Sequence, residues 1–554
     1  MEFDTAFDKS PTSGFNGTSL DSLNAVSFED FFGATPSVQA QERSLDNLPS
    51  MAAELCGLTG DMDPYVLRRY RYNDNSEFEF SKLSIRATQD EAVPVQFLLS
   101  PTDLSSASRT EAELEDGGLR SMDSDRERLS ELIPIEIGKR LIQLFIRFVC
   151  PQFPILSKTA PPDPQTAPIV QLLAAIYCVA QPFAIYDDRL CIDFAYRAPS
   201  TETLFNISWR SLNRALNLPT LAAVQSGLVL LLRPPVNELV LDSGFKWSLL
   251  GTVVSLAQSI GLHLDASSWK LPREELLLRK RISWAVYAFD NWLALSLGRP
   301  SHINKLDWLI VQLEAADLGD ETDNLPPKLS ICLQFSRLTS ILDRVLTELY
   351  SVRIATTLAS NHKATLQASQ PLLVLLTSWY QSLDSYFHNT TTEDLSGDPD
   401  PRSSVHLCYY AVKIVIIRAL LRPFYHAGAT QSTDPRERAN WESATYHSRL
   451  GAKMCANAAV KHVASLRAAH YQAFWAPWCK THLAMITNLH CLLAITSPQD
   501  EFTGAMSSLN QARAIFRVQA RSCPMIQFAL LRIDAIFWVG FDAVINNNNH
   551  DILQ

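Results

Sequence analysis

The sequence predicts an all-α fold: a large multi-helical domain, preceded by a small β-hairpin-like N-terminal element and a disordered acidic N-terminus. Hydrophobic residues make up 47% of the 554 residues and glycines number only 19, a composition typical of helical cores. Apolar residues recur at helical spacing from about residue 129 to residue 545, whereas a period of two is confined to a stretch near residue 80. A chain of this length is expected to contain two or more packed units.

Residues 1–55 are predicted to be a disordered acidic segment, because they mix small polar residues with isolated phenylalanines and show no helical period. The first fifty residues carry eight acidic and two basic side chains, which is −6 of the total charge of −10. In "FDTAFD" and "SFEDFFG" aromatic rings sit beside carboxylates, as in acidic activation segments; an ordinary acidic tail is the alternative. The candidate activation residues are Phe3, Phe7, Phe28, Phe31 and Phe32.

Residues 56–101 are predicted to form a short β-rich element. In "EFEFSKLSIRA" two phenylalanines alternate with two glutamates, and "VPVQFLLSP" follows, so a short hairpin fits best. The next segment, residues 102–128, is polar and charged and contains adjacent glycines, which indicates a linker.

Residues 129–545 show helical patterns throughout, interrupted by a polar break at residues 388–404 and followed by a tail at 546–554 that is predicted to be disordered. Ten dilute cysteines and the absence of a signal-like start favour reduced thiols. Apolar runs stay below the ~18 residues that a membrane span needs. These features predict a soluble intracellular protein that does not span a membrane.

One helix is signalled with particular clarity between Pro272 and Gly298. Pro272 suits a first turn, and two glutamates follow it at the positive end of the helix dipole. Gly298 can take the left-handed position after the last turn, and Pro300 prevents continuation. The predicted helix is therefore about 25 residues and roughly 38 Å long.

This helix has two apolar stripes, which predicts burial on both sides and a central place in the domain. One stripe comprises Ile282, Ala285, Phe289, Leu293 and Leu297, and the other comprises Trp284, Ala288, Asn291 and Leu295. The residues predicted to form its core are Trp284, Tyr287, Phe289 and Trp292.

Asp290 is the exceptional residue in this apolar helix, because a buried carboxylate needs a partner or several hydrogen bonds. We predict a structural latch in which Arg299 binds Asp290 and fixes the turn at Gly298 and Pro300. A catalytic role for Asp290 is less favoured, since no nucleophile or matched acid lies nearby in the sequence. The basic run Arg279–Arg281 is interpreted as a solvated helix end, with Glu275 placed to pair with Arg279.

The segment "LRKRISWAVYAFDNWLALSLGRPSHI" resembles the signature helix of the fungal-specific transcription factor domain, the regulatory middle homology region of fungal binuclear zinc cluster regulators. The matching positions are Arg279 to Arg281, Trp284, Tyr287, Asp290, Gly298, Arg299 and Pro300, with Gly261, Leu262 and His263 before them. The resemblance extends over about residues 57–545 and is strongest to the branch of nitrogen-catabolic co-regulators. It implies an all-helical regulatory domain that acts on transcription in the nucleus.

The chain departs from that family in its cysteines. A binuclear zinc cluster needs six closely spaced cysteines, whereas here the nearest two are twelve positions apart. Either the protein is a regulator recruited by a partner, or its zinc cluster was lost from the start of the sequence. No cofactor is expected in this chain, with zinc expected only if a missing N-terminal cluster exists.

The sequence gives weaker support for metal binding, for catalysis and for an effector pocket. A metal site could be imagined from His263, Asp265, His302 and Asp307, but their spacing fits no recognised ligand pattern. An all-helical enzyme is a remote alternative, for which "YDDRL" supplies a single carboxylate pair. A helical sensor, with Trp247, Trp269, Trp284 and Trp292 as walls of an effector pocket, is another alternative to ordinary core packing.

The resulting hypothesis is a nuclear, non-enzymatic co-regulator of RNA polymerase II genes in a fungus, acting in nitrogen or secondary metabolism. Its expected partners are other transcription regulators or the transcription machinery, with DNA reached indirectly through them. Catalytic, cofactor and metal residues are expected to be absent. Oligomeric state, whether homodimer or heterodimer, and the effector stay open.

Overall fold

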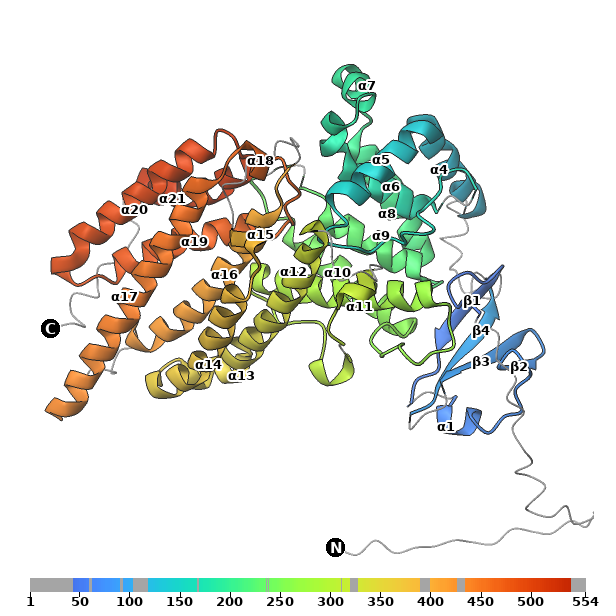
Figure 1. Cartoon of the computed structure of the whole chain (residues 1–554), viewed down its shortest axis with the longest axis horizontal. Helices are drawn as coiled ribbons and strands as arrows, with labels where there is room; N and C mark the ends of the chain where they lie inside the picture. The colour runs from blue at the N-terminus through green and yellow to red at the C-terminus, as the bar shows by residue number, and fades with distance from the viewer. Residues whose placement is uncertain are drawn as a thin grey trace, which may run out of the picture.

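The computed structural model describes residues 43–58, 62–89, 93–102, 118–166, 169–235, 237, 239–309, 311–318, 327–388, 399–425 and 434–539 (Figure 1). The candidate activation residues Phe3, Phe7, Phe28, Phe31 and Phe32 lie outside these residues, as does the predicted tail at 546–554. The strands are β1 (Met51–Leu55), β2 (Glu77–Phe80), β3 (Leu83–Gln89) and β4 (Val95–Pro101), with the short helix α1 (Pro64–Leu67) between β1 and β2.

Helices, with the segments that connect them, follow the sheet. The first group comprises α4 (Gly118–Leu132), α5 (Ile135–Phe148), α6 (Val170–Ala180), η2 (Gln181–Tyr186), α7 (Leu190–Arg197), α8 (Thr201–Ala215), α9 (Leu221–Leu232) and α10 (Ser243–Ser259). The middle group comprises α11 (Arg273–Leu297), η3 (Lys305–Asp307), η4 (Ala315–Leu318), α12 (Pro327–Val345), η5 (Leu346–Tyr350), α13 (Val352–Leu358), α14 (His362–Gln381), α15 (Ser385–His388), α16 (Arg402–Leu421) and η6 (Arg422–Tyr425). The last group comprises α17 (Pro435–Ser465), α18 (Ala468–Tyr471), α19 (Cys479–Ile495), α20 (Gln499–Gln519) and α21 (Pro524–Val539).

The β-rich element is a four-stranded antiparallel sheet in the order β1-β4-β3-β2. The predicted hairpin is β2–β3, in which Phe80 faces Leu83 across a tight turn. Strand β1 lies within the segment 1–55 that the sequence indicated to be disordered, so that boundary is too late by at least five residues. The sheet joins the helices through Phe97, whose ring packs edge-on against Trp269 at 5.4 Å between centroids.

Helix α4 replaces most of the later half of the predicted linker 102–128, since it begins at Gly118. Its charged residues include Asp125, which is only 2% exposed. Asp125 accepts a hydrogen bond from Arg210 at 2.7 Å and another from Arg214, both on α8. These bonds attach the polar helix α4 to its neighbour α8.

Helices α4, α5, α6 and α8 lie on one side of the molecule and α17, α20 and α21 on the other, with α10, α11, α12 and α16 between them (Figure 1). A single apolar cluster runs from Leu129 in α4 to Ala529 in α21, so the helices share one core. The segment Arg402–Phe424 is long and apolar enough to cross a membrane by composition, but 83% of its most apolar window is buried inside the protein. Helix α16 is thus a core helix, and it starts inside the predicted break at 388–404.

The buried His406 and the half-buried His462 make the core sensitive to acid. His406 on α16 and His462 on α17 lie 5.8 Å apart between ring centroids. Their Nε2 atoms lie 3.1 Å from the carbonyl oxygen of Phe387 and 3.3 Å from that of Ser403, so these nitrogens donate. Burial lowers the pKa of His406, and burial together with His406 lowers the pKa of His462 to about 3.

We expect the domain to lose stability as the pH falls below about 6.5, the unfolded pKa of histidine. A group whose folded pKa is depressed binds more protons in the unfolded state, so its stabilising contribution is present above the unfolded pKa and is lost on acidification. Because the folded pKa of His462 is about 3, protonation of this histidine in the unfolded state should lower the free energy of unfolding by roughly 1.4 kcal/mol between pH 7.5 and 5.5, and the lowered pKa of His406 acts in the same direction. Denaturant unfolding at several pH values checks this. In His462→Gln the free energy of unfolding should change less with pH than in the wild type, and an equal pH dependence in the variant would contradict the assignment to His462.

Candidate functional site

Helix α11 is the centre of the domain and the candidate site. Every residue from Arg281 to Leu295 is buried, so neighbouring helices enclose it on all sides. The predicted length of about 25 residues is confirmed by bounds of Arg273 and Leu297. Gly298 has φ 63° and ψ 40°, and the amide of Arg299 donates to the carbonyl of Ala294 at 3.0 Å, which closes the helix as the glycine predicts.

The four predicted core aromatics of α11 are all buried: Trp284 is 4%, Tyr287 7%, Phe289 0% and Trp292 0% exposed. Trp292 stacks on Phe335 of α12 with 5.3 Å between centroids. Phe289 meets Trp478, next to α19, edge-on at 5.3 Å. These rings therefore join the middle helices to the last helical group.

Asp290 is completely buried and fixes the chain that follows the helix. Its carboxylate accepts hydrogen bonds from the amides of His302 at 2.9 Å and Ile303 at 3.1 Å. The hydroxyl of Ser301 also donates to it, and the ring Nδ1 of His302 lies 3.2 Å away. Asp290 thus holds residues 301–303 against the helix from which it projects.

The prediction that Arg299 binds the carboxylate of Asp290 was wrong. Arg299 is exposed, and its guanidinium carbon lies 5.6 Å from the centre of the Trp247 ring. Trp247 in turn packs on the His302 ring at 3.9 Å between centroids. Arg299 therefore covers the outside of the turn, whereas backbone amides and a hydroxyl satisfy the buried carboxylate.

The two arginines of the basic run in α11 are also buried and Lys280 is half-buried, contrary to the prediction of a solvated end. Arg281 is 2% exposed and donates to the carbonyls of Pro154 at 3.0 Å, Asp317 at 3.0 Å and Leu156 at 3.4 Å. Burial lowers its pKa. One side chain thereby ties the central helix to the segment after α5 and to η4.

Arg279 makes a second set of internal contacts. It is 3% exposed, donates to the carbonyl of Ile260 at 2.9 Å and pairs with Asp46 at 2.6 Å. Its predicted pairing with Glu275 is confirmed at 3.3 Å. Burial raises the pKa of Asp46 to about 7. The positive charge of Arg279 lowers this pKa in part, and the negative charge of Glu275 raises it further. These contacts attach the residues before β1 to the central helix.

A pocket of about 190 Å³ opens beside this end of α11, smaller than typical small-molecule sites. It is lined by Gly261, Leu262, Leu264, Asp265, Ala266, Ser267, Arg273, Leu276, Leu277, Arg279, Lys280, Ser283, Trp284, Leu309, Val311 and Asp317. Of the four tryptophans considered as walls of an effector site, Trp284 lines this pocket and the others pack elsewhere. The four rings therefore do not enclose one common cavity.

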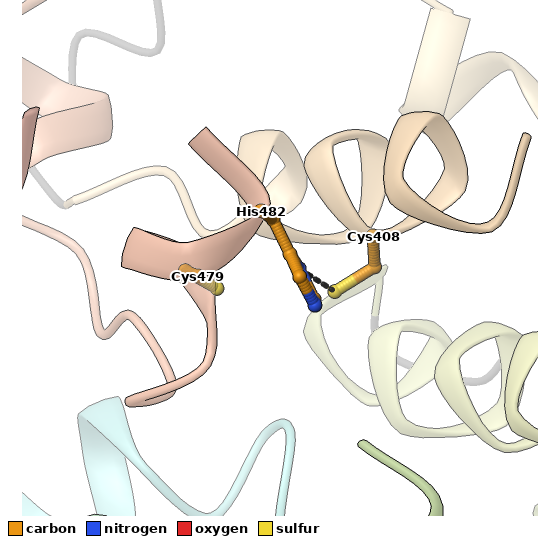
Figure 2. Close-up of side chains that lie close together, drawn as sticks. All are labelled: Cys408, Cys479 and His482. Atoms are coloured by element: carbon orange, nitrogen blue, oxygen red, sulfur yellow. Dashed lines mark hydrogen bonds between the residues drawn. The ribbon is translucent and has the colours of Figure 1, made fainter. Parts of the chain in front are cut away.

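Metal-ligating side chains converge at a place that the sequence interpretation did not consider. Among the described residues, the group whose ligand atoms come together is Cys408, Cys479 and His482, rather than the set containing His263 and His302. Figure 2 shows Cys479 and His482 on α19 beside Cys408 on α16. The C-x-x-H spacing on α19 was a readable signal for two of the ligands, but Cys408 lies 74 residues before His482.

The enclosed helix α11 is thus the centre of a large helical domain, held by buried arginines and closed by the turn at Gly298. Residues 142–389 match the model of the fungal specific transcription factor domain. No solved structure matches the chain.

The curated relatives are fungal regulators. Over 416 residues the chain is 26% identical to the transcriptional activator protein DAL81 of Saccharomyces cerevisiae, covering 66% of this chain and 40% of that protein. It is 25% identical over 316 residues to an uncharacterized transcriptional regulatory protein of Schizosaccharomyces pombe, covering 56% of this chain and 46% of that protein. A third relative, cutinase transcription factor 1 alpha of Fusarium vanettenii, is 28% identical over 232 residues, which is 40% of this chain and 25% of that protein. The chain thus spans less than half the length of each of these relatives.

Proposed function

We propose that the chain is a regulator of RNA polymerase II transcription in a fungus, and that it acts in the nucleus through protein partners. The observation that carries this proposal is the enclosed signature helix α11 within the matched domain at residues 142–389. The names of the relatives support the same role, since they are transcriptional regulators and activators. Regulation of nitrogen or secondary metabolism is the finer proposal, and it rests on the sequence resemblance alone.

Indirect action on DNA is supported by how the basic residues of α11 are used. Arg279 and Arg281 bind carbonyls and carboxylates inside the protein, so they do not offer charges to phosphates. The net charge of −10 disfavours a broad phosphate-binding surface. The printed sequence has no six-cysteine cluster pattern, so a DNA-reading cluster would have to come from sequence other than these residues or from a partner. We therefore favour contacts with other regulators or with the transcription machinery, and a regulatory role over an enzymatic one.

Residues 1–55 should activate transcription when they are brought to a promoter. Fused to a heterologous DNA-binding domain, this segment is expected to raise reporter expression about tenfold or more, because acidic residues keep its aromatic side chains available to partners. Replacing the five phenylalanines by alanine should remove the effect, while replacing five of its serines should not.

The full chain is expected to activate the same reporter when fused and to leave it unchanged when unfused. Purified chain should show no sequence-specific footprint at physiological salt, where specific binders reach about 10⁻⁸ M or tighter. A footprint at that affinity would overturn indirect action and make the chain itself the DNA reader. Silence of both fusions would contradict the proposed activating role.

A further inference from the structure

Three ligand atoms of the metal-binding type meet between α16 and α19. Cys408, Cys479 and His482 are each 0% exposed, and their ligand atoms all lie within 4.8 Å of one another. The sulfur of Cys408 lies 3.9 Å from Nδ1 of His482. Cys479 and His482 are three residues apart on α19, so they project from the same face toward α16 (Figure 2).

The imidazole of His482 is incompletely satisfied. Its Nε2 is buried and has no hydrogen-bond partner within the described part of the protein. The ring of Trp292 packs against this imidazole with 5.4 Å between centroids and does not supply a hydrogen-bond partner for Nε2. A buried polar atom without a partner costs about 1–3 kcal/mol, so an additional bond to this ring would be favourable.

The spacing fits a single small ion. Atoms bound to one Zn²⁺ at about 2.3 Å for sulfur and about 2.0 Å for nitrogen lie roughly 3.5–4 Å from one another. The separations in this cluster are at that value or within about 1 Å of it. Two thiols with an imidazole and no carboxylate select a thiophilic ion such as zinc or copper(I), and disfavour magnesium and calcium.

We propose that Cys408, Cys479 and His482 bind one thiophilic metal ion, zinc or copper(I), which joins α16 to α19 in the middle of the core. The ion replaces the proton of each thiol, so two protons are released while two metal–sulfur bonds and one metal–nitrogen bond form. One nitrogen of the His482 ring binds the ion, which gives a further bond to a buried side chain whose hydrogen bonding is incomplete. With Zn²⁺ the two thiolates leave the site neutral, whereas Cu⁺ leaves it with one negative charge, and a buried charge is costly. Zinc is therefore the expected ion.

This site differs from the DNA-reading zinc cluster of the family, because its ligands come from two core helices and not from one short cysteine-rich segment. Since the ligands are fully buried, the ion must enter as the domain folds, and it becomes part of the stability of the fold. The site would hold the middle and last helical groups in a fixed relation.

The metal content of the purified full chain tests the proposal directly. Elemental analysis of protein from cells grown with zinc and copper is expected to find about one zinc per chain after dialysis against a weak chelator. About one copper per chain would also support the site and would name copper(I) as its ion. Less than about one-tenth of an equivalent of either metal would overturn the proposal.

Substitutions assign the ion to these ligands. Cys408→Ser and His482→Gln should each lose the metal, whereas Cys455→Ser should keep it, because Cys455 is a similarly buried thiol, 2% exposed, on α17. If the ligand variants do not fold, cobalt-loaded wild-type protein decides between the outcomes. Visible and near-ultraviolet absorption of a thiolate-bound cobalt ion supports the site, and its absence overturns the proposal. Retention of the metal in both folded ligand variants would likewise overturn it.

Discussion

Replacing Asp290 by alanine is expected to lower the free energy of unfolding by about 3–5 kcal/mol. The substitution removes the acceptor of the His302 and Ile303 amides and of the Ser301 hydroxyl. It does so at a fully buried position, where water cannot replace the lost bonds without opening the turn. Chemical denaturation of the full chain, monitored by tryptophan fluorescence, measures the change.

Arg299→Ala is the matched control, because Arg299 was the donor expected from sequence and is exposed. Its loss should cost less than about 1 kcal/mol, the size of an exposed cation–π contact. Asp290→Asn should fall between the two, since the amide keeps the shape and one oxygen acceptor. An Arg299→Ala effect as large as that of Asp290→Ala would show that the arginine, and not the 301–303 backbone, holds the carboxylate.

The bounds and burial of α11 could be predicted because their signals are local. Pro272, Gly298 and Pro300 act within a turn of the helix ends, and the apolar stripes lie within the helix itself, between Ile282 and Leu297. The partner of Asp290 could not be predicted in the same way. Its donors are mainly backbone amides of the turn after Pro300, and backbone amides have no sequence signature.

Long-range contacts account for the other differences. Arg281 looks like a solvated cation in sequence, but it bonds carbonyls of Pro154 and Leu156, which lie 127 and 125 residues earlier. Strand β1 is too short and mixed to be recognised alone, and it is stabilised by pairing Met51 with Pro101 on β4. The Cys408 ligand is a third case, since only the packing of α16 on α19 brings it to His482. In each case folding, and not local pattern, supplies the partner.

Arg281→Ala is expected to be the other strongly destabilising change in α11, at about 3–5 kcal/mol. It leaves the carbonyls of Pro154, Leu156 and Asp317 without their donor and opens a cavity at a position that is 2% exposed. Arg281→Met fills much of the cavity but restores no donor, so it should recover only part of the loss, about 1–2 kcal/mol. Thermal and denaturant unfolding of the three proteins should show stability decreasing in the order wild type, Arg281→Met, Arg281→Ala.

The neighbouring Lys280→Ala provides the control, because Lys280 pairs with Asp317 at 2.7 Å from a side chain that is 21% exposed. A partly exposed ion pair should be worth about 1 kcal/mol or less. Arg281 and Asp290 are nine residues apart on the helix, about 14 Å at its rise per residue, and they share no recorded partner. Their effects should therefore add to within about 0.5 kcal/mol in the double variant. If the double variant is no less stable than Asp290→Ala alone, the two effects are not additive. Both substitutions would then disrupt the same set of contacts, and α11 would be anchored cooperatively along its length and not separately at its two ends.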